Sequence, residues 1–275
     1  MTDLVFKYGT LIRSGPKLIN GGKWDATLAE EVRNSRTNAD LTIYIRIYFS
    51  KIDPAGGGKK GTYPDTDDTP TTPSKRRIRA WGRGEFDRFA NNLVAGAQRF
   101  WNGVFWLKTP DTYEDLNWPD ESPTHHCHLY CKFELSRALE EKDSHYTIAA
   151  VRVADNETFR SNSRLYSQRD IESENMIPHS TAKFWTHFHE VGHLLGLGHV
   201  GHGGVTNVHN DNSDQAYGVT MKEMTDVMGR GSLRHKWHAT PWQQAAEEFT
   251  GVAAKDWDVH LTHIWPTMLA KGGRR

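Results

Sequence analysis

Three histidines and one glutamate lie close together in the segment 189–199, with a spacing that suits a metal site. In a helix with 3.6 residues per turn, His189 and His193 project from one face and can bind the same ion. Glu190 lies about 100° further round the helix, so its carboxylate is poorly directed as a ligand but can reach a water molecule beside the ion. Gly196 can adopt a left-handed conformation that ends the helix, which allows the chain to bring back His199 as a third ligand.

The chemistry of this set of residues is that of a catalytic zinc site. Three protein ligands leave the fourth position of a tetrahedral zinc ion for water, whereas structural zinc sites are closed. Zinc lowers the pKa of that water to about 7, and Glu190 is placed to take its proton as a general base. We therefore predict zinc (Zn2+) as the cofactor, His189, His193 and His199 as metal ligands, and Glu190 as the catalytic residue.

The segment 189–199 fits the pattern HExxHxxGxxH at every defining position, and in this it resembles the metzincin zinc metallopeptidases. The resemblance implies a methionine in a tight turn beneath the metal, some distance after the third histidine. Met228 is the candidate for this structural Met-turn, because Gly229 and Gly231 after it favour a sharp reversal of the chain. Some metzincins place a tyrosine two residues after the methionine, whereas this chain has Arg230 there.

The hydropathy pattern predicts the elements that must position these residues. Alternating branched and aromatic residues over 40–50 predict a central strand, and an apolar stripe at helical spacing predicts a helix over 86–101. The metal-binding helix is expected over 181–195, and a C-terminal helix over 240–249 with a capping box formed by Thr240 and Gln243. Further strands are predicted over 105–107, 126–135, 146–153 and 165–166.

This order of elements predicts an α+β fold with an α/β-type mixed sheet. The resemblance implies a metzincin-like catalytic domain over residues 40–252, with a twisted, mostly parallel sheet, a backing helix, the active-site helix, the Met-turn and the C-terminal helix. Residues 1–39 are then an N-terminal extension and residues 253–275 a C-terminal tail. The segment 54–77 is rich in Gly, Pro, Thr, Asp and Lys, so we interpret it as a flexible loop within the domain.

Composition limits the partners and the route of delivery. The 275 residues include 34 Lys and Arg against 34 Asp and Glu, so no overall field attracts nucleic acid or an anionic membrane, and we expect neither partner. The chain begins without a basic segment followed by a long apolar run, so no classical signal peptide is expected. With no recognisable pro-segment either, we expect a monomer delivered by a specialised secretion system, as a bacterial effector or toxin, with a carrier or a cognate inhibitor as partner.

Two further groups of residues could bind metals but favour other roles. Cys127 and Cys131 lie four apart on a predicted strand, about 13 Å from each other, so free thiols are expected. His126 and His128 point to the opposite face of that strand, which argues against a second zinc site. The oxygen-rich segment 210–214 lacks the glycine and glutamate of an EF-hand, so a polar turn is favoured over a calcium site.

The expected function is that of a zinc-dependent endopeptidase that hydrolyses peptide bonds through a zinc-bound water activated by Glu190, with a polypeptide substrate. Two alternatives stay open: a zinc amidohydrolase acting on a non-protein amide such as peptidoglycan, and a non-catalytic zinc-binding protein, which has no need of Glu190. Tyr217, His235 and His238 could each donate a hydrogen bond to the oxyanion of the tetrahedral intermediate, and the sequence does not choose among them.

Overall fold

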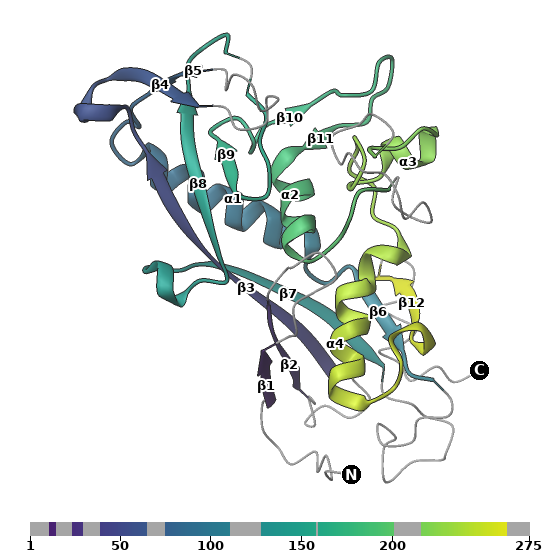
Figure 1. Cartoon of the computed structure of the whole chain (residues 1–275). Helices are drawn as coiled ribbons and strands as arrows, with labels where there is room; N and C mark the ends of the chain where they lie inside the picture. The colour runs from purple at the N-terminus through teal and green to yellow at the C-terminus, as the bar shows by residue number, and fades with distance from the viewer. Residues whose placement is uncertain are drawn as a thin grey trace.

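The computed structural model of the chain has a mixed α+β fold, in which one large sheet is accompanied by a few helices (Figure 1). It describes residues 11–14, 24–29, 39–64, 75–110, 128–157, 159–200 and 216–262. Within these ranges no helix is long and apolar enough to cross a membrane.

The elements follow one another along the chain as strands with interspersed helices. The strands are β1 (Leu11–Ser14), β2 (Asp25–Ala29), β3 (Ala39–Ile52), β4 (Lys60–Pro64), β5 (Lys75–Arg79), β6 (Phe105–Lys108), β7 (Leu129–Arg137), β8 (Tyr146–Val153), β9 (Leu165–Ser167), β10 (Ser173–Glu174), β11 (Phe184–Trp185) and β12 (Asp258–Leu261). The helices are α1 (Glu85–Trp101), α2 (Thr186–Leu194), α3 (Met221–Thr225) and α4 (Thr240–Thr250), with short 3-10 turns at Ala55–Gly57, Glu141–Asp143, Lys236–Ala239 and Ala254–Asp256.

The large sheet is parallel at its centre and antiparallel at its flanks. Its strands run in the order β12-β6-β7-β3-β8-β5-β4, and β3 pairs in parallel with β7 on one side and β8 on the other. The pairs β6 with β12, β4 with β5, and β2 with β3 are antiparallel. The central strand predicted over 40–50 is confirmed as β3, and the strands predicted over 105–107, 146–153 and 165–166 are confirmed as β6, β8 and β9.

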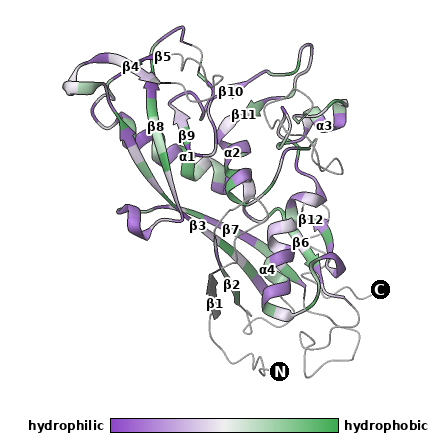
Figure 2. Ribbon diagram, in the orientation of Figure 1, coloured by the Kyte–Doolittle hydropathy of each residue, from purple (hydrophilic) through white to green (hydrophobic). Residues whose placement is uncertain are grey.

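One face of the sheet carries the hydrophobic core. The odd-numbered residues of β3 from Ala39 to Phe49 are all buried, while the alternate side chains are mostly half-buried, and Figure 2 shows this alternation of hydropathy along β3 and β7. Helix α1 covers this face near one end, where the rings of Phe49 and Phe89 lie 6.4 Å apart. Helix α4 covers it near the other end, where Phe133 and Trp242 lie 6.4 Å apart. The backing helix predicted over 86–101 is therefore confirmed as α1.

The segment 54–77 is not the continuous loop that we predict from its composition. Strands β4 and β5 form an antiparallel pair, and β5 joins the sheet through β8. The reason is the buried side chain of Ile78, which packs with Val151 and Val153 in a small cluster beyond the main core. Residues 65–74 lie outside the described part of the chain. Strands β2 and β12 also extend the sheet beyond the predicted domain limits of 40 and 252.

The helix that carries His189 and His193 is shorter than the predicted 181–195. Phe184 and Trp185 form strand β11, which pairs with Ser173 and Glu174 of β10, so the backbone groups just ahead of the helix are held in a two-stranded ladder. Helix α2 begins only after this ladder, at Thr186. Aromatic residues fit a strand well, and here the tertiary partner decides between the two conformations.

The C-terminal helix is found as predicted, but its predicted capping box is absent. Thr240 donates a hydrogen bond to the carbonyl of Trp237 instead, and Gln243 donates to the carbonyl of Trp257. Helix α4 continues directly from the preceding 3-10 turn, so Ala239 is its N-cap and Thr240 already has helical backbone angles. Gly251 ends the helix in the left-handed conformation, with a φ of 72°.

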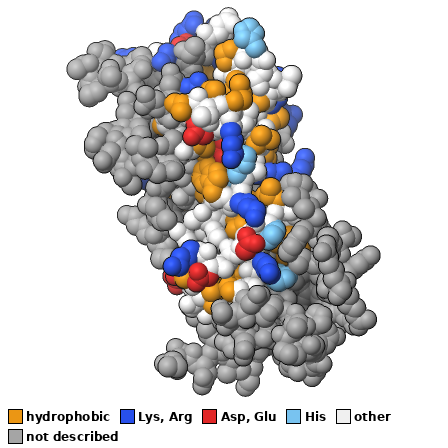
Figure 3. All heavy atoms as spheres, turned by 90° about the vertical axis from the view of Figure 1, so that its right-hand side faces the viewer, with side chains coloured by type: hydrophobic (Ala, Val, Ile, Leu, Met, Phe, Trp, Pro, Cys, Tyr) orange, Lys and Arg blue, Asp and Glu red, His pale blue; other side chains and the backbone are white. Residues whose placement is uncertain are grey.

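The surface shows charges of both signs. Figure 3 views the molecule from the side of α3 and β12 and shows cationic, anionic and hydrophobic side chains intermixed over the described residues of that face. This agrees with the equal numbers of basic and acidic residues in the sequence.

Candidate metal centre

The three imidazoles singled out by the motif meet at one point. The Nε2 atoms of His189 and His193 are 3.1 Å apart, those of His193 and His199 3.0 Å, and those of His189 and His199 3.2 Å. Three nitrogens arranged tetrahedrally around zinc at about 2.0–2.1 Å would be separated by roughly 3.3 Å, so this triangle is close to the size that one ion requires. Among the described residues this is the one group of three or more such side chains placed to hold a metal ion.

The hydrogen bonds of the imidazoles direct their lone pairs at that point. His189 Nδ1 donates to the carbonyl of Val227 at 2.8 Å, and His193 Nδ1 donates to the carbonyl of Leu197 at 2.8 Å. Because a carbonyl can only accept, the proton of each neutral ring lies on Nδ1 and the lone pair on Nε2 faces the other histidines. Lone pairs that converge in this way repel one another unless a cation lies between them, so the donor set fits a metal ion.

Burial favours the neutral form of His189. His189 is 1% exposed, and desolvation, with further contributions from the neighbouring rings of His193 and His199, lowers its pKa well below the ordinary value. A neutral imidazole is the form that binds a metal, so proton competition for His189 is weak at neutral pH.

The turn after α2 confirms the role predicted for the glycine of the motif. Gly196 has a φ of 94°, in the region that favours glycine. Its amide bonds to the carbonyl of His193, and the next amide, of Leu197, bonds to the carbonyl of Gly192. The reversal brings the Leu197 carbonyl to the ring of His193 and returns His199 to the metal centre.

Met228 lies directly beneath the helix that carries two of the ligands. Its side chain is fully buried, and a Cβ atom added at Gly192 on α2 would overlap its sulfur atom and lie 3.3 Å from Trp101. Trp101 also donates a hydrogen bond from its indole nitrogen to the carbonyl of Phe188 on α2. The helix, the methionine and the indole are thus packed without spare room below the three imidazoles.

This packing predicts that the mutation Gly192→Ala lowers the free energy of unfolding. Alanine favours a helix over glycine by about 1 kcal/mol, but here its methyl group would displace Met228 or shift α2, and overpacking a core costs about 1–3 kcal/mol. We expect a net loss of unfolding free energy and weaker metal binding, measured by urea unfolding and by competition with a chromogenic chelator. The double mutant Gly192→Ala, Met228→Ala provides the control, because it should recover part of the metal affinity. Unchanged stability and affinity in the single mutant would contradict the packing described.

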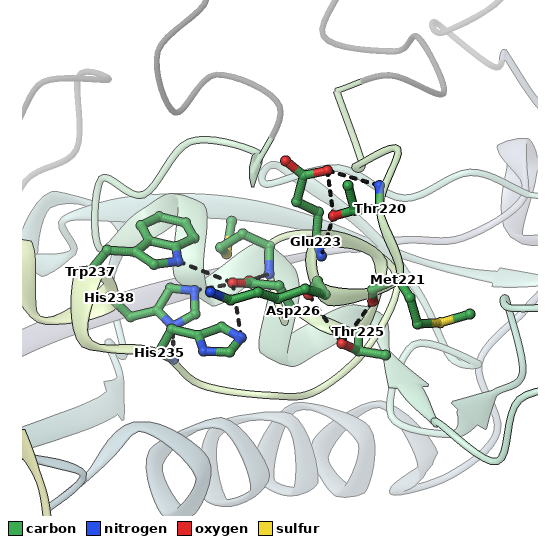
Figure 4. A network of polar contacts seen from close by, with 10 residues as sticks. Thr220, Met221, Glu223, Thr225, Asp226, His235, Trp237 and His238 are labelled. Atoms are coloured by element: carbon green, nitrogen blue, oxygen red, sulfur yellow. Dashed lines mark hydrogen bonds and ion pairs between the residues drawn. The ribbon is translucent and has the colours of Figure 1, made fainter.

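The turn that contains Met228 is held from below by a buried carboxylate. Asp226 accepts hydrogen bonds from the amide of Met228, from His238 Nε2 and from Trp237 Nε1, and His235 Nε2 lies 3.8 Å from it (Figure 4). His238, which the sequence leaves open as an oxyanion donor, is therefore hydrogen-bonded to Asp226 below the turn. His235, another of these candidates, lies beside the same carboxylate at 3.8 Å, beyond hydrogen-bond distance. The sequence does not single out Asp226, because nothing local connects it to the histidines that follow it.

Tyr217, the third candidate donor, lies against the histidine cluster. Its ring centroid is 4.2 Å from that of His199 and 5.6 Å from that of His189, nearly parallel to the latter. The phenol oxygen accepts a hydrogen bond from Arg160 at 3.3 Å. Of the three residues considered from the sequence, Tyr217 is the one that the structure places beside the histidine cluster.

Glu190 is buried on α2 at the sheet side of the metal centre. Its side chain is 6% exposed, and its charge contributes, after burial, to raising the pKa of Tyr166 well above the ordinary value. Tyr166 lies on β9, and its buried hydroxyl has no hydrogen-bond partner among the described residues. The carboxylate thus lies in a largely water-excluded surrounding, where its interactions are stronger than in bulk solvent.

The start of α2 is hydrogen-bonded to the backbone of a second buried acidic residue, Asp170. The backbone carbonyl of Asp170 accepts hydrogen bonds from the amide and from Nδ1 of His187, at 3.2 and 2.7 Å. The side chain of Asp170 accepts from the hydroxyls of Ser161 and Ser167. Burial raises the pKa of Asp170 to about 7, although these hydrogen bonds act in the opposite direction.

The raised pKa of Asp170 predicts a pH-dependent stability. The folded state holds this proton between the ordinary pKa of 3.8 and about 7, so the stabilisation is complete below pH 3.8 and is lost as the pH rises through 7. In Asp170→Asn this pH dependence is absent, because the amide does not titrate. From pH 5 to pH 8 we expect the parent to lose on the order of 2–3 kcal/mol relative to the variant in urea unfolding of the metal-free proteins.

The comparison with Asp170→Asn controls for the neighbouring histidine. Burial lowers the pKa of His187 to about 4, so its contribution has the opposite sign and is lost as the pH falls below 6.5 towards 4. Both proteins carry His187, and its effect cancels in the difference between them. Parallel pH profiles for the parent and the variant would refute the assignment to Asp170.

The other candidates weighed from the sequence lie apart from this site or outside the described residues. Cys131 is a buried free thiol on β7, and His128 accepts a hydrogen bond from the amide of Thr109. Cys127 and His126 fall outside the described residues, as does the polar segment 210–214.

Comparison with known proteins identifies no relative of this chain. No protein-family model, curated protein or solved structure matches this chain. The chain is thus a mixed α+β protein with a cluster of three histidines that could bind a metal ion.

Proposed function

We propose that this chain is a zinc-dependent endopeptidase of the metzincin type. The single observation that carries the proposal is the convergence of the Nε2 atoms of His189, His193 and His199 within 3.2 Å, on and just after a helix that also bears the buried Glu190. Three imidazoles leave a fourth position for a reacting group, and the adjacent carboxylate supplies the base that hydrolysis needs.

Two features support the metzincin type over a generic zinc helix. The left-handed Gly196 returns the third histidine within a few residues of the helix end. Met228 then lies under the ligand-bearing helix, and the residue before it, Val227, accepts the hydrogen bond of His189. A glycine-ended helix and a methionine turn below the metal are the features that the motif resemblance implies.

Zinc, when bound, supplies a Lewis acid that polarises the substrate carbonyl and lowers the pKa of water to about 7. Glu190 takes a proton from the attacking water and, as the peptide bond breaks, gives a proton to the leaving amine. Its buried position limits the solvent that would otherwise compete for that proton. Tyr217, packed against His199, is the candidate donor to the oxyanion that develops on the carbonyl oxygen.

A profile of cleaved bonds in a peptide library tests this proposal. The zinc-loaded parent is compared with the same protein after chelation and with Glu190→Ala. We expect cleavage at internal peptide bonds by the parent, none after chelation, and recovery when zinc is restored. A protein that binds one zinc ion but cleaves no peptide, and instead hydrolyses a cell-wall amide offered in parallel, would overturn the endopeptidase assignment.

A further inference from the structure

We propose that Asp226 is a positioning residue of the metal centre, which acts on His189 through the carbonyl of Val227. Asp226 is 2% exposed and is not one of the three side chains placed to hold a metal ion. It lies instead at the centre of a buried polar network under the turn that contains Met228 (Figure 4). The inference rests on the proposed zinc site but is independent of whether peptides are the substrate.

Three N–H donors fix the Asp226 carboxylate: one comes from the turn itself, and two come from side chains of the segment 237–238. Oδ1 accepts from the amide of Met228 at 2.7 Å and from Nε2 of His238 at 2.9 Å. Oδ2 accepts from Nε1 of Trp237 at 3.1 Å. Hydrogen bonds to a charged acceptor are among the stronger ones in proteins, and removing one partner of a buried set leaves the other unsatisfied. The network therefore ties the turn to the 3-10 segment Lys236–Ala239.

The tautomer of His238 is determined by its other neighbour. The amide of His235 donates to His238 Nδ1 at 2.8 Å, so the proton of the neutral ring lies on Nε2 and points at Asp226. His238 has no exposed surface, and burial lowers its pKa, which favours this neutral form. Its ring also packs edge-on against Trp101, 5.8 Å between centroids, below α2.

Backbone hydrogen bonds of the turn hold the Val227 carbonyl in the position from which it accepts the hydrogen bond of His189. The Asp226 carbonyl accepts from the amides of Gly229 and Gly231, each at 3.0 Å, and the amide of Val227 bonds to Leu233 at 2.9 Å. With bonds on both sides, the peptide group after Val227 has little freedom to rotate. Its carbonyl is aimed at His189 Nδ1, 2.8 Å away, which sets both the ring orientation and the proton position of that ligand.

The substitution Asp226→Asn is the most specific probe of this network. The amide side chain has nearly the shape of the carboxylate, but one of its two polar atoms is an NH2 group. If the amide oxygen keeps the two donors at Oδ1, the NH2 group faces the N–H of Trp237, and two donors then oppose each other. Trp237→Phe removes that opposing donor, and Trp237 is 39% exposed, so the substitution is tolerable for the fold.

The experiment measures zinc affinity by chelator competition, and the visible spectrum after replacement of zinc by Co2+, in the parent, Asp226→Asn, Trp237→Phe and the double mutant. We expect Asp226→Asn to bind zinc about 10–100-fold more weakly, as loss of partners behind a ligand does, and to show an altered Co2+ spectrum. Trp237→Phe alone should weaken binding a few-fold, and the double mutant should regain most of the affinity lost in Asp226→Asn. Circular dichroism checks that each variant is folded.

Each outcome decides the inference. Parent-like zinc affinity in Asp226→Asn, or a double mutant no better than Asp226→Asn, would overturn it. If Asp226→Asn does not fold, Trp237→Phe decides alone, and parent-like affinity and Co2+ spectrum in that variant would also overturn it. Zinc binding with no peptide hydrolysis in the parent would defeat the proposed function while leaving the positioning role intact.

Discussion

Glu190→Ala is expected to keep its zinc and to lose hydrolysis by about 10²- to 10⁴-fold in kcat, the range that a general base contributes. Two of the three imidazoles in the cluster, His189 and His193, are directed by the carbonyls of Val227 and Leu197, and neither contact involves Glu190. Removal of the carboxylate therefore takes away the proton acceptor and leaves the ligand geometry in place. Metal analysis and single-turnover kinetics on the same preparation give the two readouts.

Two conservative variants at this position separate the role of Glu190 as a proton acceptor from its contribution to packing. Glu190→Gln fills the same buried space without accepting a proton, so we expect it to behave like the alanine variant in kcat and like the parent in stability. Glu190→Asp retains a carboxylate one methylene further from the site and should keep a small part of the activity. If Glu190→Gln hydrolyses peptides as fast as the parent does, the general-base mechanism is wrong.

His193→Ala is expected to lose both the metal and the activity. With one of three ligands gone, the remaining Nε2 atoms of His189 and His199, 3.2 Å apart, can form only two bonds to the ion. The stabilisation that bound zinc gives the folded state, about 2.7 kcal/mol when the ion is present at 100 times its dissociation constant, should disappear with it. Thermal unfolding with and without zinc, together with metal analysis, measures the effect.

A histidine away from the cluster serves as the matched control for that experiment. His260 lies on β12, the last strand at one end of the sheet, and contacts Asp258 at 2.7 Å. His260→Ala removes an imidazole without touching the proposed ligands, so its unfolding temperature should still rise when zinc is added. A zinc-dependent shift in His193→Ala as large as in His260→Ala would show that the ion binds elsewhere.

The sequence predicts those parts of the molecule that depend on local spacing. Helix periodicity places His189 above His193, and the need for a left-handed residue after the helix identifies Gly196, as the φ of 94° confirms. The alternation of apolar residues likewise identifies β3, since one face of that strand is buried along its length. In each case the conformation is determined by residues that are close together along the chain, so the sequence alone reveals it.

The parts that sequence analysis missed depend on partners far along the chain. Strand β11 displaces the start of the metal-binding helix because β10 pairs with it, and β5 forms because Ile78 finds a hydrophobic cluster around β8. The Asp226 network follows the same rule, since its effect reaches His189 through a hydrogen bond that spans 38 residues. No spacing within the segment 226–238 reveals that contact.

Zinc-dependent hydrolysis at the three-histidine site can be tested by titrating the metal-free protein with zinc and following the rate of peptide hydrolysis. We expect activity to rise linearly and to stop rising at one zinc ion per chain, and we expect Glu190→Ala to bind the same single equivalent without gaining activity. Peptide hydrolysis that persists in the metal-free protein, or one equivalent of bound zinc with no hydrolysis of any peptide offered, would show that this site is not a zinc peptidase centre.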